Sequence, residues 1–147
     1  MRSSIKRACA LALLGAAGGA VPAAAQTSGD FSGLYTFQTT DYREGAEVGV
    51  LSGVLRSTPL GGGWYDINLY AIEYLQTAEG ERRNTAAQDC DGRRDGPVIT
   101  ITCTVLNTDA PGYLPDNFTL RQHNSWQWDG SFTSFSGSNV TFIHYED

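Results

Sequence analysis

The chain has 147 residues, of which ten are basic and sixteen acidic, so its formal net charge at neutral pH is −6. Three basic residues, Arg2, Lys6 and Arg7, lie in a leader that we expect to be removed, which leaves a balance of 10 − 3 − 16 = −9. So acidic a chain opposes binding to nucleic acid or to an anionic membrane, since both depend on basic side chains that neutralise phosphates.

Residues 1–25 have the layout of a secretory signal peptide. The basic start precedes an apolar stretch at 8–21 that ends near Ala23-Ala24-Ala25, and such small residues mark the cleavage site. The stretch is shorter than the roughly 20 residues that cross a bilayer, so we expect no membrane span. Cleavage near Ala25 predicts a periplasmic or extracellular protein whose residues 26–147 form a single domain.

Alternating apolar residues indicate strands through most of that domain. The strands expected before the last third of the chain are 31–40, 48–57, 64–74 and 98–106, with a loop at 41–47 and a turn at 59–63. The strand at 64–74 has two different faces, one aliphatic and one that mixes aromatic and polar side chains. We expect the mixed face, Trp64, Asp66, Asn68 and Tyr70, to point into the fold.

Between these strands lies a charged stretch at 77–97 with hardly any large apolar residue. It is expected to be an exposed loop, tied down at Cys90 and turned by Asp91-Gly92 and Asp95-Gly96. A second loop at 107–116 contains two prolines, and Tyr113 and Leu114 within it are expected to fold back as a plug.

Two cysteines, Cys90 and Cys103, remain after cleavage. In an oxidising compartment an even pair in a small domain predicts a structural disulfide, and only one pairing exists. Cys103 shares one strand face with Ile99 and Ile101, and threonines occupy the other face. This pattern places the Cys103 sulfur on the core side of the strand.

The last segment, 117–145, has the pattern of consecutive antiparallel hairpins. Apolar residues alternate around two breaks, Asp129-Gly130 and 136–139, and such residues favour tight turns. With seven or eight short strands and no amphipathic helix outside the leader, the domain is expected to be all-β, a small antiparallel meander barrel or a sandwich.

Two short motifs resemble those of small secreted calycin barrels, the group that includes lipocalins, avidins and bacterial metalloprotease-inhibitor barrels. Gly33-Leu34-Tyr35 opens the first strand where lipocalins have Gly-x-Trp, and Trp128-Asp129-Gly130 falls in a late hairpin. Tyr35 departs from the lipocalin pattern. The resemblance implies a calycin-like barrel and transfers no binding residue.

No catalytic or metal-binding motif stands out. The two histidines, His123 and His144, form no HxH or HExxH pattern, and there is no Gly-x-Ser-x-Gly elbow or phosphate-binding glycine loop. Asp66 and Glu73 would serve acid–base chemistry only if burial raised a pKa. We therefore expect no enzymatic activity, no cofactor and no metal.

The many aromatic residues either pack the core or line a ligand cavity, and the second alternative suggests a binding function. Our first hypothesis is a non-enzymatic barrel that binds a small apolar or aromatic ligand in its lumen. The residues expected to line that site are Trp64, Asp66, Asn68, Tyr70, Trp126 and Trp128. The alternative is a protein-interaction module, such as an inhibitor of a secreted enzyme, that acts through the loops at 79–94 and around Tyr113. In either case we expect a monomer.

Overall fold

The computed structural model describes residues 29–136 and 138–145, so the expected signal peptide lies outside the described part of the chain. The described residues form an all-β structure without helices, as predicted. Its nine strands are β1 (Gly33–Thr39), β2 (Tyr42–Glu44), β3 (Glu47–Gly61), β4 (Trp64–Thr77), β5 (Gly80–Asp95), β6 (Val98–Thr108), β7 (Phe118–Gln122), β8 (Gln127–Phe132) and β9 (Asn139–Tyr145).

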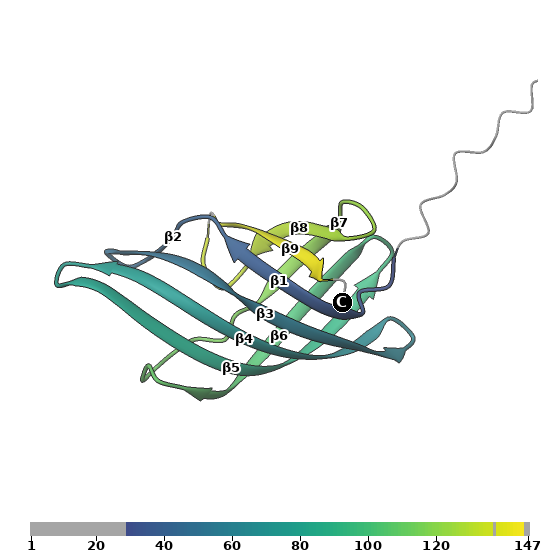
Figure 1. Ribbon diagram of the computed structural model, residues 1–147, viewed down its shortest axis with the longest axis horizontal. Helices are drawn as coiled ribbons and strands as arrows, with labels where there is room; N and C mark the ends of the chain where they lie inside the picture. Colours follow the sequence, from purple (N-terminus) through teal and green to yellow (C-terminus); the bar gives the residue numbers. More distant parts are fainter. Residues whose placement is uncertain (1–28, 137, 146–147) are drawn as a thin grey trace, which may run out of the picture.

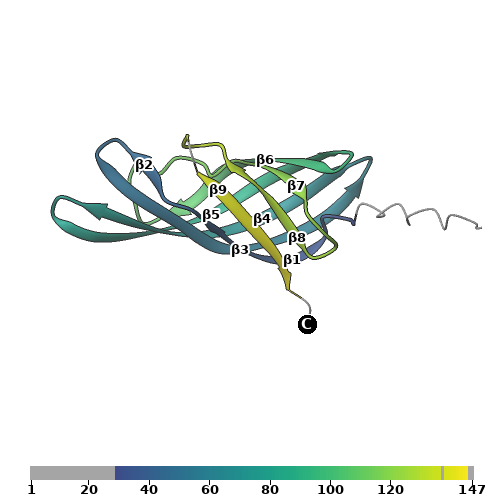
Figure 2. The same cartoon turned by 90° about the horizontal axis from the view of Figure 1, so that it is seen from above.

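The strands close into an eight-stranded antiparallel barrel with one extra strand. From β3 to β9 each strand pairs with its neighbours in sequence, β9 pairs with β1, and β1 pairs with β3 to complete the ring. The short β2 continues the line of β1 and pairs only with the start of β3. The meander barrel expected from the turn spacing is therefore confirmed (Figures 1 and 2). Closure leaves no long free sheet edge around the ring.

The longest strands are β3, β4 and β5, which run side by side along the length of the molecule (Figure 1). The prediction of a loop at 77–97 is wrong, because 80–95 is one continuous strand paired with both β4 and β6. Its inward residues are small or polar, among them Ala86, Gln88 and Cys90. A strand with so few large apolar side chains lacks the alternation by which strands are recognised.

Aromatic side chains fill the middle of the barrel. Phe31 stacks on Tyr35 with ring centroids 4.5 Å apart, and Phe37 stacks on Phe142 at 4.9 Å. Further edge-to-face and tilted contacts connect these rings to the other members of the core, Phe118, Phe132, Tyr42 and Trp128. Such pairs add stabilisation beyond the apolar area that they bury.

The Asp129-Gly130 break is not the turn that the sequence suggested. Both residues lie within β8, where Gly130 is paired with Leu120 of β7. A Cβ atom at Gly130 would lie 2.0 Å from the carbonyl oxygen of Thr119. Glycine is therefore needed here because two backbones approach closely, and the chain turns later, between β8 and β9.

The predicted disulfide is present. Cys90 and Cys103 are directly paired across β5 and β6, both are buried, and their sulfur atoms are 2.04 Å apart. As expected, the Cys103 sulfur lies on the core side of its strand.

Replacing both cysteines by alanine is expected to lower the free energy of unfolding by about 3 kcal/mol, because the bridge closes a loop of about 14 residues in the unfolded state. Urea denaturation of the double variant measures the loss, and reduction of the native protein should lower the midpoint similarly. An unchanged midpoint in both experiments would mean that the bridge adds nothing to stability.

Candidate functional site

The inward orientation expected of one β4 face is wrong. Trp64, Asp66, Asn68 and Tyr70 all lie on the outside of the barrel, and the two aromatic rings are 44% and 43% exposed. The opposite face, Tyr65, Ile67, Leu69 and Ala71, is buried instead. These four residues carry no carboxylate or amide that would need a partner away from water. Farther along the same face, the carboxylate of Glu73 is buried with two hydrogen-bond partners.

The two remaining tryptophans of the expected site are separated by the barrel wall. Trp128 is 1% exposed and belongs to the core, whereas Trp126 is 48% exposed beside the β7–β8 turn. The six predicted ligand-binding residues therefore do not converge on one cavity. The lumen that they were expected to line is occupied by packed aromatic rings.

One end of the barrel is closed by the segment just before β1. Phe31 is fully buried and contacts Tyr35 and Trp128, while the carboxylate of the preceding Asp30 accepts a hydrogen bond from the Tyr65 hydroxyl. Arg94 donates a hydrogen bond to the carbonyl oxygen of Gly29 at 2.7 Å. These contacts fill that mouth of the lumen with the chain's own residues.

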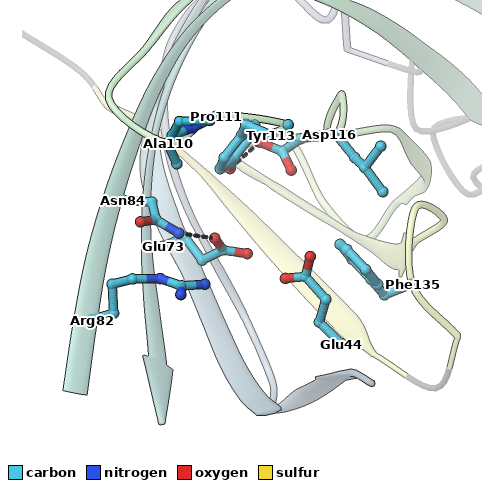
Figure 3. A pocket seen from close by; sticks show the side chains of 11 residues that line it. Glu44, Glu73, Arg82, Asn84, Ala110, Pro111, Tyr113, Asp116 and Phe135 are labelled. Carbon is cyan, nitrogen blue, oxygen red and sulfur yellow. Dashed lines mark hydrogen bonds between the residues drawn. The ribbon is translucent and has the colours of Figure 1, made fainter. Parts of the chain in front are cut away.

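The other end contains a small polar pocket of about 60 Å³. Figure 3 shows the carboxylates of Glu44 and Glu73 and the guanidinium of Arg82 directed towards one another, with Tyr113 and Asp116 beyond them. The volume suits a few water molecules and is far below the 300–1,000 Å³ of typical ligand sites. This pocket cannot hold the apolar ligand that the sequence suggested.

Glu73 is 4% exposed and its two oxygens have partners. Tyr42 donates its hydroxyl to one oxygen at 2.5 Å, and the Asn84 amide donates to the other at 2.8 Å. Burial raises the pKa of Tyr42, and the bond to Glu73 adds to this, so the phenol remains a donor at neutral pH.

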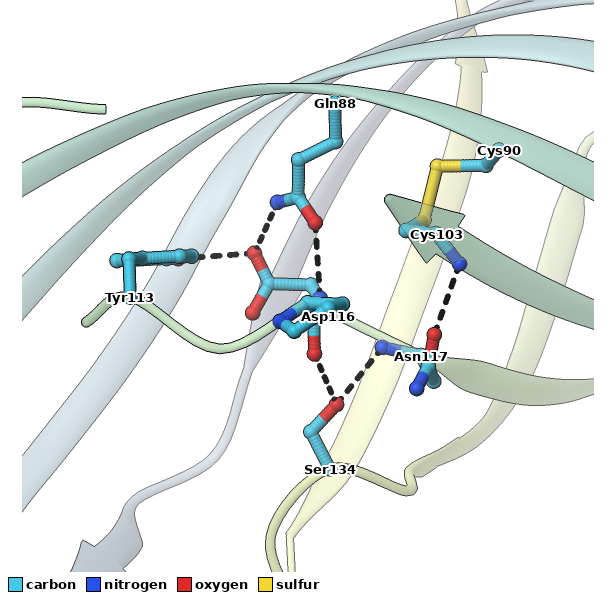
Figure 4. Close-up of a disulfide and its surroundings, with 8 residues drawn as sticks. Gln88, Cys90, Cys103, Tyr113, Asp116, Asn117 and Ser134 are labelled. Carbon is cyan, nitrogen blue, oxygen red and sulfur yellow. Dashed lines mark hydrogen bonds between the residues drawn. A yellow bond between two sulfur atoms is a disulfide. The ribbon is translucent and has the colours of Figure 1, made fainter. Parts of the chain in front are cut away.

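The second buried carboxylate belongs to Asp116, in the loop between β6 and β7 (Figure 4). It accepts hydrogen bonds from the Gln88 amide at 2.5 Å and from the Tyr113 hydroxyl at 2.8 Å, and its backbone N–H donates to the Gln88 side-chain oxygen at 2.9 Å. Burial raises the pKa of Asp116 to about 7, although these bonds oppose the shift. The loop is thus fixed to β5 by a group that titrates near neutrality.

The expected plug is present in part. Tyr113 is half-buried over the pocket and hydrogen-bonded to Asp116, but Leu114 is 54% exposed. No sequence pattern singles out Asp116, Gln88 or Asn84 as site residues. Only recognition of β5 as a strand would have placed Gln88 and Asn84 on one inward face.

The candidate acid–base residues do not assemble into a catalytic arrangement. Asp66 and Glu73 lie on opposite sides of the barrel wall. His144 packs against the Tyr35 ring with centroids 5.1 Å apart, and the exposed His123 lies 3.6 Å from a carboxylate oxygen of Asp129. Within residues 29–136 and 138–145, no group of three or more histidine, cysteine or acidic side chains has a metal-binding arrangement.

A band of exposed apolar side chains crosses the outside of the barrel. We define the apolar band as Leu34, Val54, Tyr70, Leu106 and Tyr145. Leu34 is half-buried, and the other four side chains are between 43% and 66% exposed.

The strand register and two shallow grooves connect the members of the apolar band. Tyr145 of β9 is opposite Leu34 of β1, and Val54 of β3 is opposite Tyr70 of β4. Between β1 and β3 the contact is diagonal, because Leu34 is directly opposite the exposed Arg56. Two shallow grooves of about 210 and 340 Å³ adjoin there and share Leu34 and Val54, and the larger one extends to Leu106 on β6. The exposed apolar surface is therefore connected across several strands.

The geometry defines a closed antiparallel β-barrel with a filled lumen and an apolar outer band. No protein-family model, no curated protein and no solved structure matches this chain. The described residues include no helix that is long and apolar enough to cross a membrane.

Proposed function

We propose that this chain is a non-enzymatic, exported binding module whose apolar band docks another protein. The observation that carries the proposal is the continuity of exposed apolar side chains from Tyr145 on β9 to Leu106 on β6. Single exposed apolar residues are ordinary on protein surfaces, whereas connected patches mark interaction sites.

The extent of the band favours a protein over a small molecule. The band crosses six neighbouring strands, from β9 through β1, β3, β4 and β5 to β6, and has a member on each of them except β5. Neighbouring strands lie about 4.8 Å apart, so the band follows roughly 24 Å of the barrel surface. A small molecule would cover only part of that length, while a protein interface of ordinary size covers about 800 Å² on each partner.

The alternative hypothesis from the sequence therefore becomes the leading one, but with a different contact surface. The stretch expected as an interacting loop at 79–94 is mostly strand β5, and Tyr113 faces the polar pocket. A sheet face on a closed barrel is rigid, which lowers the entropy lost on binding. The lumen hypothesis lacks support because aromatic rings fill the space that a ligand would need.

Photo-cross-linking in the native host tests this proposal. With p-benzoylphenylalanine at Tyr70 or Leu106, we expect a discrete adduct with one other protein. The control position is Thr119, exposed on β7 across the barrel from β3, and there we expect no such adduct. Equal adducts at all three positions, or none at Tyr70 and Leu106, would refute docking on the band.

The double variant Val54→Ser, Tyr70→Ser is expected to reduce the Leu106 adduct at least about tenfold, since it removes two central apolar contacts worth over 1 kcal/mol together. Both side chains are about half exposed, so stability should change by less than about 1 kcal/mol. Urea denaturation checks the fold. If the variant folds and its Leu106 adduct is as abundant as that of the native protein, the proposal is contradicted.

A further inference from the structure

Three carboxylates stand beside the apolar band on the outer face of β4 and β5. We define the acidic ladder as Asp66, Asp89 and Asp91, all of which are exposed. Asp66 is directly opposite Asp91 in the sheet, and Asp89 is opposite Asn68. Like charges at directly opposed positions destabilise a sheet.

No ion pair relieves this repulsion within the described residues. The ion pairs found in 29–136 and 138–145 are Arg82 with Glu47 and His123 with Asp129, and neither involves the ladder. Arg93 is close in sequence, but its guanidinium lies 4.8 Å over the Trp64 ring. Arg56 on β3 is also exposed on this face, opposite Asn68, and forms no ion pair with the ladder. The three carboxylates of the ladder therefore outnumber these two nearby basic side chains.

The acidic ladder and the apolar band form one surface. Along β5, Asp89 is two residues from Ala87, which is paired with Tyr70 of the band, so the step from band to ladder is about 7 Å. On the far side of the ladder, Trp64 and Asp91 line an outer groove of about 420 Å³. A partner that covers the band therefore reaches the carboxylates as well.

We propose that the partner is a cationic protein that places lysine or arginine side chains on the acidic ladder while its apolar residues cover the band. This inference rests on the function proposed above and adds the charge of the partner. Opposite charges at an interface set its register and raise the association rate, and they exclude acidic partners. The excess of acidic over basic residues in the whole chain would assist the encounter over longer distances.

Two synthetic peptides of equal length, one alternating leucine with lysine and one alternating leucine with glutamate, provide a defined probe. Each is titrated into the ¹⁵N-labelled mature protein, and amide shifts are followed by NMR. We expect the lysine peptide to bind over β3, β4 and β5 and the glutamate peptide not to bind. Raising the salt concentration from about 0.05 to about 0.3 M should weaken binding several-fold, since the contacts are exposed to solvent.

The triple variant of the acidic ladder, with each aspartate changed to asparagine, should weaken lysine-peptide binding about tenfold, because three exposed ion pairs are lost. The matched control Asp41→Asn, Glu79→Gln, Glu81→Gln makes the same change in net charge at exposed positions elsewhere and should leave the affinity within about twofold, since distant charges are screened.

The outcomes separate the two proposals. One outcome is that the triple variant binds the lysine peptide as tightly as the native protein does while Val54→Ser, Tyr70→Ser loses binding. That result would contradict the role of the acidic ladder and support docking on the apolar band. If the triple variant and its matched control lose lysine-peptide affinity equally, the effect comes from net charge alone. That result would also contradict a specific role of the acidic ladder. Peptide shifts that avoid β3 and β4 altogether would refute the docking surface itself.

Discussion

Trp128→Ala is expected to lower the free energy of unfolding by about 3–5 kcal/mol, the usual cost of deleting a large buried aromatic side chain. Trp128 is 1% exposed, lies 5.2 Å from the Phe31 ring centroid, and has the Arg94 guanidinium 5.7 Å over its own ring. Its removal would open a cavity at the place where the barrel mouth is sealed. Urea denaturation followed by circular dichroism measures the loss without depending on tryptophan fluorescence.

The chain provides a matched control two residues earlier. Trp126 is 48% exposed, so Trp126→Ala should change the free energy of unfolding by less than about 1 kcal/mol. Comparable losses in the two variants would mean that the barrel wall does not separate these side chains as described. The filled lumen would then be in doubt.

The stability of the fold should fall as the pH rises from about 4 to about 7. Unfolded Asp116 ionises near 3.8, whereas burial raises its pKa in the folded protein to about 7. Between these values the folded state binds more protons than the unfolded state, and stability therefore decreases with pH. A difference of three pKa units corresponds to about 4 kcal/mol. The free energy of unfolding should therefore be lower by about that amount above pH 7 than below pH 4.

The titratable and charged groups that face Asp116 either add to this decrease in stability with rising pH or leave it unchanged. Burial raises the pKa of Glu44 on β2, and repulsion from Glu73 on β4 adds to it. Tyr113 remains a hydrogen-bond donor because burial and the charge of Asp116 raise its pKa. Arg82 on β5 is engaged with Glu47 at 3.2 Å.

Asp116→Asn tests the origin of this pH dependence. Its side-chain oxygen can still accept the hydrogen bonds from Gln88 and Tyr113, but it carries no charge. We expect the variant to be more stable than the native protein at pH 8 and to show a much flatter profile between pH 4 and 7. Unfolding free energies across that range decide the matter, and the prediction fails if the native profile persists in the variant.

Much of the barrel could be predicted from sequence because alternation and turn chemistry are local properties. The strands β1, β3, β4, β6 and β9, the all-β class and the disulfide all follow from them. The prediction that the Trp64 face of β4 points inward is wrong because it rests on the aromatic rings and not on the polar residues between them. Asp66 and Asn68 keep the Trp64 face in water, and the wholly apolar Ile67 and Leu69 define the buried side.

The features that sequence reasoning missed depend on contacts between distant segments. β5 carries no large apolar residue, and at Gly92 the side chains of neighbouring strands occupy the space in front of it. A Cβ atom at Gly92 would lie 2.8 Å from the Ile67 side chain. The polar pocket likewise joins Glu73 to Asp116 across long chain separations, and the apolar band exists only once β9 meets β1 and β1 meets β3. No spacing in the sequence encodes these encounters.

Native mass spectrometry of the protein, purified gently from its own host, tests most directly whether binding occurs outside the barrel. We predict a chain that releases no small molecule on denaturation and that carries a protein partner, which the Val54→Ser, Tyr70→Ser variant loses. A stoichiometric small apolar molecule, retained by that variant and quenching the fluorescence of Trp128 on rebinding, would contradict the account. It would restore the lumen as the binding site.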